Sequence, residues 1–128
     1  MVKVILVSHG NLAPALLQTA SEICCFEENR VYAYSVKNGG LEEIGTQITN
    51  LSKQDDVLVL ADTFGGSGCN TALSCSSGLN NVCVVCGVNL NMLLAVLNNI
   101  DRFALKELAH KAVDDGKKAV FNATEIIK

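Results

Sequence analysis

One histidine and one aspartate in this sequence could together carry out nucleophilic chemistry. His9 follows the first apolar run of the chain and Asp62 follows the third. Asp62 is the only charged side chain between Asp56 and Asp101, so its carboxylate needs a partner at the end of an apolar strand. The imidazole of His9 could donate one ring nitrogen to that carboxylate and keep the other as a nucleophile.

A glycine-rich turn follows Asp62 and would suit a phosphate group. Gly65, Gly66 and Gly68 allow close backbone approach, and Ser67 is expected to cap the helix that follows. Amides at a helix start form a ready phosphate site. The turn alone is a weak signal, because it matches neither the dinucleotide-binding pattern nor the P-loop. Its interpretation as phosphate-binding therefore depends on the histidine and the aspartate.

The two histidines of the sequence have different surroundings. By itself, His9 is more simply interpreted as a histidine hydrogen-bonded at a strand end, and the aspartate reverses that preference. His110 lies among Lys106, Glu107 and Lys111 on a charged predicted helix. We expect it to be a solvated or helix-end residue and assign it no catalytic role.

Continuous apolar runs predict the strands that position these residues. Such runs are typical of sheets covered on both faces, and they span Val2 to Val7, Val31 to Val36, Val57 to Ala61 and Val82 to Val88. Helical patterns lie between them, with apolar positions at Leu16, Leu17, Ala20, Ile23; Leu41, Ile44, Ile48, Leu51; and Met92, Leu93, Val96, Leu97. The alternation predicts a single-domain α/β fold, an open and mainly parallel sheet with helices on both faces.

Parallel strands bring their carboxyl ends to one rim, where open α/β sheets bind ligands. The segments after the first, third and fourth runs would therefore lie together. Beside the residues already named, Thr63, Asn70 and Asn89 are expected to support the site.

Turn and cap residues predict the element boundaries. Asn38-Gly39-Gly40 is expected to form a turn, and Ser76-Ser77-Gly78 to end a short helix. Asp101 is expected to cap a last helix that continues to about Asp115 and stops at Gly116.

The segment after that helix is expected to be a further strand. Lys117 to Phe121 would most easily sit at an edge of the sheet or pair with another subunit. It therefore predicts a homodimer.

Composition limits the class of protein. The chain has 128 residues, of which 49% are hydrophobic and 18% charged, so one folded domain over residues 1–128 is expected rather than disorder. A net charge of -3 argues against nucleic-acid partners. No apolar stretch is long enough for a bilayer, and the first residues lack a cleavage site, so we expect a soluble, unprocessed intracellular protein.

The six cysteines are interpreted as buried, reduced thiols that the chemistry of His9 does not need. Cys83 and Cys86 form a CxxC, but a strand points side chains three apart to opposite faces, which spoils a redox or chelating pair. The others, Cys24 with Cys25 and Cys69 with Cys75, do not have zinc-ligand spacing, so no metal is expected. Cys69 is the exception to watch, because it follows the glycine-rich turn.

Three segments of the sequence form a joint pattern: Val-Ile-Leu-Val-Ser-His-Gly, then Leu-Ala-Asp-Thr-Phe-Gly-Gly-Ser with Asn70 after it, and Gly-Val-Asn-Leu before Met92. Together they resemble the enzyme IIA components of the mannose-type bacterial phosphotransferase system. Their order and spacing cover nearly the whole chain. The sequence departs from the family at Gly68 and Asn91, where the family usually has proline.

The resemblance implies a phosphoryl carrier that drives sugar uptake and phosphorylation. His9 would accept the phosphoryl group from the histidine-containing phosphocarrier protein and pass it to an enzyme IIB, while Asp62 hydrogen-bonds to the histidine. No cofactor is implied. The resemblance also implies a cytoplasmic homodimer that works with membrane permease components. The chain ends without a linker, which favours a free-standing component.

Other interpretations remain open at this point. The phosphotransferase subunit of a dihydroxyacetone kinase shares the early histidine, but the Gly-Gly-Ser and Gly-Val-Asn-Leu segments favour the sugar branch. A tetrapyrrole metal chelatase would need a second metal-directing residue in the cleft, and the surroundings of His110 argue against it. A non-catalytic regulatory domain would not explain the lone carboxylate of Asp62.

Overall fold

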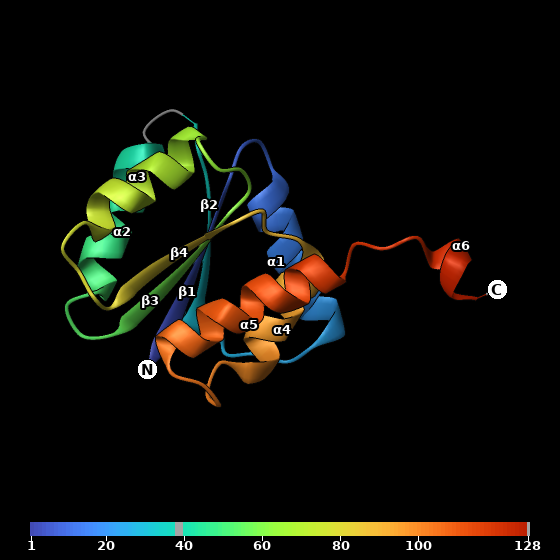
Figure 1. Ribbon diagram of the computed structural model, residues 1–128. Helices are drawn as coiled ribbons and strands as arrows, with labels where there is room; N and C mark the ends of the chain where they lie inside the picture. Colours follow the sequence, from blue (N-terminus) through green and yellow to red (C-terminus); the bar gives the residue numbers. More distant parts are fainter. Residues whose placement is uncertain (38–39, 128) are drawn as a thin grey trace.

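Parallel strands form one four-stranded sheet in the computed structural model, which describes residues 1–37 and 40–127 (Figure 1). The strand order is β2-β1-β3-β4, with β1 (Val2–Ser8), β2 (Val31–Ser35), β3 (Asp56–Ala61) and β4 (Val82–Cys86). The helices are α1 (Leu12–Ile23), α2 (Gly40–Leu51), α3 (Ser67–Ser76), α4 (Leu90–Asn99), α5 (Leu105–Lys118) and α6 (Ala123–Ile126), with a 3-10 turn at Glu28–Arg30. The predicted α/β class and the four predicted strands are confirmed.

Helices cover both faces of the sheet, which explains why the strands are apolar throughout. Val4 and Leu6 of β1 belong to the core under α1, α4 and α5, whereas Ile5 and Val7 face the core under α2 and α3. Figure 1 shows these two helical layers on either side of the strands. None of the helices in residues 1–37 and 40–127 is long and apolar enough to cross a membrane.

Two of the predicted boundaries involve glycine-containing turns. Helix α3 ends at Ser76, and Gly78 follows with a φ of 79°, as the Ser-Ser-Gly sequence predicts. Of the predicted turn at Asn38-Gly39-Gly40, the first two residues lie outside the described part of the chain. Gly40 begins α2.

The predicted stop at Gly116 is wrong, because α5 continues through it to Lys118. Gly116 is buried against α4, and a Cβ atom there would lie 2.7 Å from Cε of Met92. This glycine allows close packing of α5 on α4, and it does not mark the end of the helix.

The predicted strand over Lys117 to Phe121 is also wrong. Lys117 and Lys118 form the last turn of α5, and the chain then extends away from the sheet to the short α6 (Figure 1). A strand needs a hydrogen-bonded neighbour, and within the part of the chain that the structure describes this segment has none.

Asp101 does not cap α5, whose N-cap is Ala104. It instead pairs with Arg30, whose side chain is nearly completely buried. The Arg30 Nε donates to the carbonyl of Val2 at 3.0 Å, and the Arg30 Nη2 donates to Asp101 Oδ1, also at 3.0 Å. These bonds tie the start of β1 to the segment between α4 and α5. The hydrogen bond from Arg30 lowers the pKa of the Asp101 carboxyl.

Replacing Asp101 with asparagine should lower the free energy of unfolding at neutral pH, because it removes the nearer of the two carboxylates, Asp101 and Glu27, that face a buried guanidinium. The pKa of Asp101 is lower in the folded state, so its contribution is present above the unfolded value of about 3.9 and is lost as the pH falls through the folded value. Denaturant unfolding of both proteins from about pH 7 to pH 3 should show the difference shrinking with acidification. Asp114→Asn, which removes a charge from α5, is the control. A difference that stays constant with pH would contradict this role of Asp101.

Candidate functional site

The site lies where the strand order of the sheet reverses. β1 and β3 are neighbours, and the chain leaves β1 for α1 on one face and β3 for α3 on the other face. Diverging connections of this kind open a crevice at the carboxyl ends of the strands. His9 follows β1 and Asp62 follows β3, so the fold brings these two residues to the crevice.

His9 and Asp62 are in direct contact. Asp62 Oδ2 accepts a hydrogen bond from the His9 backbone amide and another from His9 Nδ1, each at 2.9 Å. Asp62 Oδ1 accepts from the amide of Thr63, also at 2.9 Å. One carboxylate therefore fixes both the backbone and the ring of the histidine.

The environment of Asp62 keeps it ionised. Partial burial by itself would raise the pKa of the Asp62 carboxyl, but the hydrogen bonds from the His9 amide, the His9 ring and the Thr63 amide outweigh burial and lower it. An ionised carboxylate only accepts hydrogen bonds, so the proton of a neutral His9 ring belongs on Nδ1. Nε2 then keeps a free lone pair on a side chain that is 55% exposed.

The start of α3 differs in detail from the prediction. The N-cap is Gly66, no side chain caps the helix, and Ser67 is its first residue, so the predicted cap by Ser67 is wrong. The hydroxyl of the exposed Ser67 is thus left for other contacts. Backbone amides of residues 67–69 lie in the first turn, where an α-helix provides no internal acceptor, and they are the donors that a phosphate would need.

Two glycines of the turn are required by close contacts. A Cβ atom on Gly66 would lie 2.9 Å from His9 Cε1 and 2.8 Å from Thr63 Oγ1, so a side chain there would displace the histidine ring or the threonine. A Cβ atom on Gly68 would collide with a methyl group of Val7. Gly65 has a φ of 83°, in the left-handed region that favours glycine. The turn thus lies directly against the histidine.

Two of the predicted supporting residues hold this turn in place. Thr63 donates its amide to Asp62, and its carbonyl accepts from the amide of Gly66 at 3.4 Å. Asn70 donates from Nδ2 to the carbonyl of Gly65 at 3.3 Å. Both residues stabilise the loop between β3 and α3 through hydrogen bonds.

Asn89 has a different task. Its Oδ1 accepts from the amide of Met92 at 3.0 Å, which caps α4, and its Nδ2 donates to the carbonyl of Gly116 at 3.2 Å. The side chain is therefore committed to joining α4 and α5. Neither of these hydrogen bonds connects Asn89 to His9.

Sequence reasoning missed Ser8 and Phe64. Ser8 is fully buried, and its Oγ accepts from the amide of Ala13 at 2.6 Å, which fixes the turn that carries His9. Its place between an apolar strand and a histidine was the available signal. Phe64 is 82% exposed in the loop after Asp62.

The cysteines do not share the buried environment that the sequence predicts. All six are free thiols, but only Cys69 is buried, Cys25 is exposed, and the rest are intermediate. Cys83 packs into the core under α1, α4 and α5, whereas Cys86 contacts Cys69 of α3, so the CxxC residues do face opposite sides of the sheet.

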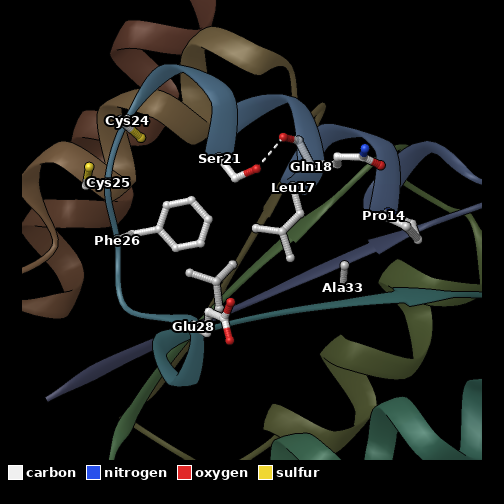
Figure 2. Close-up of a pocket in the computed structure, with 10 residues that line it drawn as sticks. Pro14, Leu17, Gln18, Ser21, Cys24, Cys25, Phe26, Glu28 and Ala33 are labelled. Atoms are coloured by element: carbon white, nitrogen blue, oxygen red, sulfur yellow. Dashed lines mark hydrogen bonds between the residues drawn. The ribbon is translucent and has the colours of Figure 1, made fainter.

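A separate hollow of about 610 Å³ opens between α1, the segment after it and β2 (Figure 2). In Figure 2, Leu17, Phe26 and Ala33 line the hollow, with Glu28 at its lower edge. Among the described residues that line it, none is a predicted site residue. His9 does not line this hollow. His110 is exposed on α5, and in the described part of the chain no cluster of three or more metal-ligating side chains occurs.

The fold is an open α/β sheet with a histidine and an aspartate at the carboxyl ends of its strands. Comparisons of the chain with known proteins agree with this arrangement. Residues 3–113 match the family EIIA-man, described as "PTS system fructose IIA component", where PTS is the phosphotransferase system. The chain belongs to this family, as its sequence motifs predicted. PTS EIIA proteins are phosphotransferase components of sugar transport.

Curated relatives support the same family. The fructose-specific EIIA component of Bacillus subtilis is 30% identical over 112 residues, which cover 84% of this chain and 77% of that protein. The mannose-specific EIIAB component of Escherichia coli K12 is 30% identical over 124 residues, or 93% of this chain. The match spans only 38% of the length of the Escherichia coli protein.

Solved structures share the fold. An EIIA component from Streptococcus agalactiae superposes with a TM-score of 0.86 at 22% identity, over 98% of this chain and 99% of that one. A IIA protein associated with the fucose utilization operon of Streptococcus pneumoniae superposes with a TM-score of 0.79 at 27% identity, over 99% of this chain and 96% of that one.

Proposed function

We propose that the whole chain, residues 1–128, is one enzyme IIA domain that carries a phosphoryl group on His9. The group is accepted from the histidine-containing phosphocarrier protein and passed to an enzyme IIB, which drives sugar uptake and phosphorylation in the cytoplasm beside the membrane permease. The observation that supports this most is the hydrogen bond from His9 Nδ1 to Asp62, which leaves Nε2 as the nucleophile on an exposed ring.

The transfer needs no cofactor in this proposal. The Nε2 lone pair attacks the phosphorus of the donor's phosphohistidine, a new N–P bond forms, and the N–P bond of the donor breaks with its electron pair remaining on the donor ring. The proton stays on His9 Nδ1, where the Asp62 carboxylate offsets the positive charge that develops on the ring. Amides around Gly65 to Gly68, together with that of Cys69 in the first turn of α3, and the Ser67 hydroxyl bind the phosphoryl oxygens.

Protein partners, rather than a small molecule, would dock on the rim. Phe64 is 82% exposed beside Asp62, and Leu12 is 45% exposed three residues after His9. Exposed apolar side chains next to a reactive group are typical of a protein-binding surface. The two partners would use the same surface in turn, since each must present its own reactive residue to His9.

Incubation with labelled phosphoenolpyruvate and the general phosphotransferase proteins tests the proposal. We expect label on this chain only when the histidine-containing phosphocarrier protein is present, and loss of that label when a cognate enzyme IIB is added. Labelling without the phosphocarrier protein, or none with it, would contradict the proposed relay. The relatives are named as a fructose-specific EIIA component and a mannose-specific EIIAB component. These names favour the sugar relay over a subunit serving dihydroxyacetone kinase.

We also propose that the protein is a homodimer joined by its C-terminal segment. Four large apolar side chains that follow α5 are exposed in the single chain: Val120, Phe121, Ile126 and Ile127. The segment extends away from the body (Figure 1), and a second copy would provide the neighbour that the single chain lacks.

Cutting the chain after Ala119 should reduce the mass in light scattering from that of a dimer to that of a monomer, or cause aggregation. This position leaves α5 intact, since the helix ends at Lys118. The helix must be kept because its Gly116 packs against Met92 and accepts a hydrogen bond from Asn89. A full-length variant with Val120→Ser and Phe121→Ser should lose the dimer in the same way. A wild-type chain that remains monomeric at high concentration would rule the dimer out.

A further inference from the structure

Two cysteines from different elements meet beside the His9 crevice. Cys69 lies in the first turn of α3 and Cys86 is the last residue of β4, and their sulfur atoms are 2.9 Å apart. Both are free thiols. A disulfide bond is about 2.05 Å long, so bond formation requires the sulfur atoms to approach by about 0.9 Å.

The other cysteines are placed differently. Cys83 packs into the core on the opposite face of β4, and Cys24 and Cys25 follow α1 beside the hollow of Figure 2. Cys75 lies two turns further along α3, near the position of Gly45. The contact between Cys69 and Cys86 is thus the one that joins two elements of the crevice.

Cys86 is close to the proposed phosphoryl site. In the pairing of β3 with β4, it lies opposite Ala61, the residue before Asp62. Burial, the contact with Cys69 and the nearby charge of Asp62 together raise the pKa of the Cys86 thiol to about 12. The thiol is therefore protonated at neutral pH, which slows its oxidation.

We propose that Cys69 and Cys86 form a reversible disulfide under two-electron oxidants such as hydrogen peroxide, and that this disulfide slows phosphoryl acceptance by His9. The second half rests on the proposed function. One thiolate attacks the peroxide and becomes a sulfenic acid with release of hydroxide. The second thiol attacks that sulfur and expels water, so one S–S bond replaces two S–H bonds and the peroxide is reduced to two water molecules.

The effect on transfer follows from the position of Cys69. Its amide is in the first turn of α3, and Gly66 at the start of that turn lies against the His9 ring. Drawing Cys69 toward β4 moves the amides that bind the phosphoryl oxygens relative to His9. A displacement of about 1 Å in an active site can slow a reaction by up to a hundred-fold. Because α3 and β4 would share the approach of about 0.9 Å between the sulfur atoms, each moves less than this, and we expect transfer to slow roughly five- to twenty-fold.

The test oxidises the full chain with hydrogen peroxide at about pH 8.5, where more thiolate is available. Proteolytic cleavage after Leu73 or Leu79 separates Cys69 from Cys86, so a disulfide would keep the two fragments linked. In mass spectrometry, the linked product should be lighter by two hydrogen atoms than the sum of the two reduced fragments. The initial rate of labelling from the phosphocarrier protein is measured on the same samples before oxidation, after it, and after reduction with dithiothreitol.

Cys86→Ala and Cys83→Ala are the matched variants, since both change β4 but only the first removes a partner of the pair. After oxidation, wild type and Cys83→Ala should give linked fragments and a slower initial rate of labelling, and dithiothreitol should restore that rate. Cys86→Ala should show neither linked fragments nor slower labelling. Absence of linked fragments in wild type overturns the disulfide. Linked fragments with an unchanged rate, or equal slowing in Cys86→Ala, overturn its effect on transfer. Failure of the reduced wild-type protein to accept label, whether or not oxidation gives linked fragments, would instead contradict the proposed function.

Discussion

His9→Ala should accept no phosphoryl group at all from the phosphocarrier protein. The proposed nucleophile is His9 Nε2, and an alanine leaves no lone pair at that place in the crevice. Because the His9 side chain is 55% exposed, its removal should leave the fold intact. Labelling from phosphoenolpyruvate, followed by gel analysis, measures the result.

His110→Ala is the matched control, because it removes the other histidine from the exposed side of α5 and should label at the wild-type rate. The wild-type label should be acid-labile and base-stable, and NMR of the phosphorylated protein should assign it to Nε2. An acid-labile, base-stable phosphate on the His9→Ala protein would overturn the assignment.

Asp62→Ala should slow transfer by about a hundred-fold or more, as is typical for the loss of a group that orients a reacting imidazole. Asp62 accepts from His9 Nδ1, so without it the ring can rotate and present the wrong tautomer. The measurement is the initial rate of labelling at limiting phosphocarrier protein.

Asp62→Asn separates orientation from charge. An asparagine oxygen can still accept from the His9 amide and ring, but it carries no charge and cannot also serve Thr63 from its second position. We expect a slowing of about ten-fold, smaller than that of the alanine variant. Circular dichroism and denaturant unfolding on both variants control for folding, since Asp62→Ala also leaves two backbone amides without their acceptor. A wild-type rate in Asp62→Asn would show that the charge plays no part.

The features that sequence predicted well are those that residue types and their positions along the chain indicate directly. β1 is buried on both faces, so its residues must be apolar throughout, and that composition is visible without a structure. The contact of His9 with Asp62 could also be anticipated, because an isolated carboxylate after an apolar strand needs a partner and parallel strands end at one rim.

The features that sequence did not predict depend on contacts between distant elements. Gly116 looks like a helix stop, but it serves close packing against Met92 of another helix. Asp101 looks like a cap, but it pairs with Arg30, which is 71 positions away. The contact of Cys69 with Cys86 likewise joins a helix and a strand, and the spacing of the cysteines gives no sign of it.

The two halves of the crevice lie far apart along the chain although they touch in space. His9 and Asp62 are 53 positions apart, and the sequence between them includes α1, β2, α2 and β3. A chain emerging from a ribosome therefore exposes its histidine well before the aspartate that orients it has been synthesised. Until β1 and β3 have paired, closing a long loop, His9 is an ordinary unoriented imidazole. Under the proposed function, efficient phosphoryl acceptance would therefore begin only in molecules that have completed the centre of their sheet, and nascent or unfolded copies would take little phosphate from the relay.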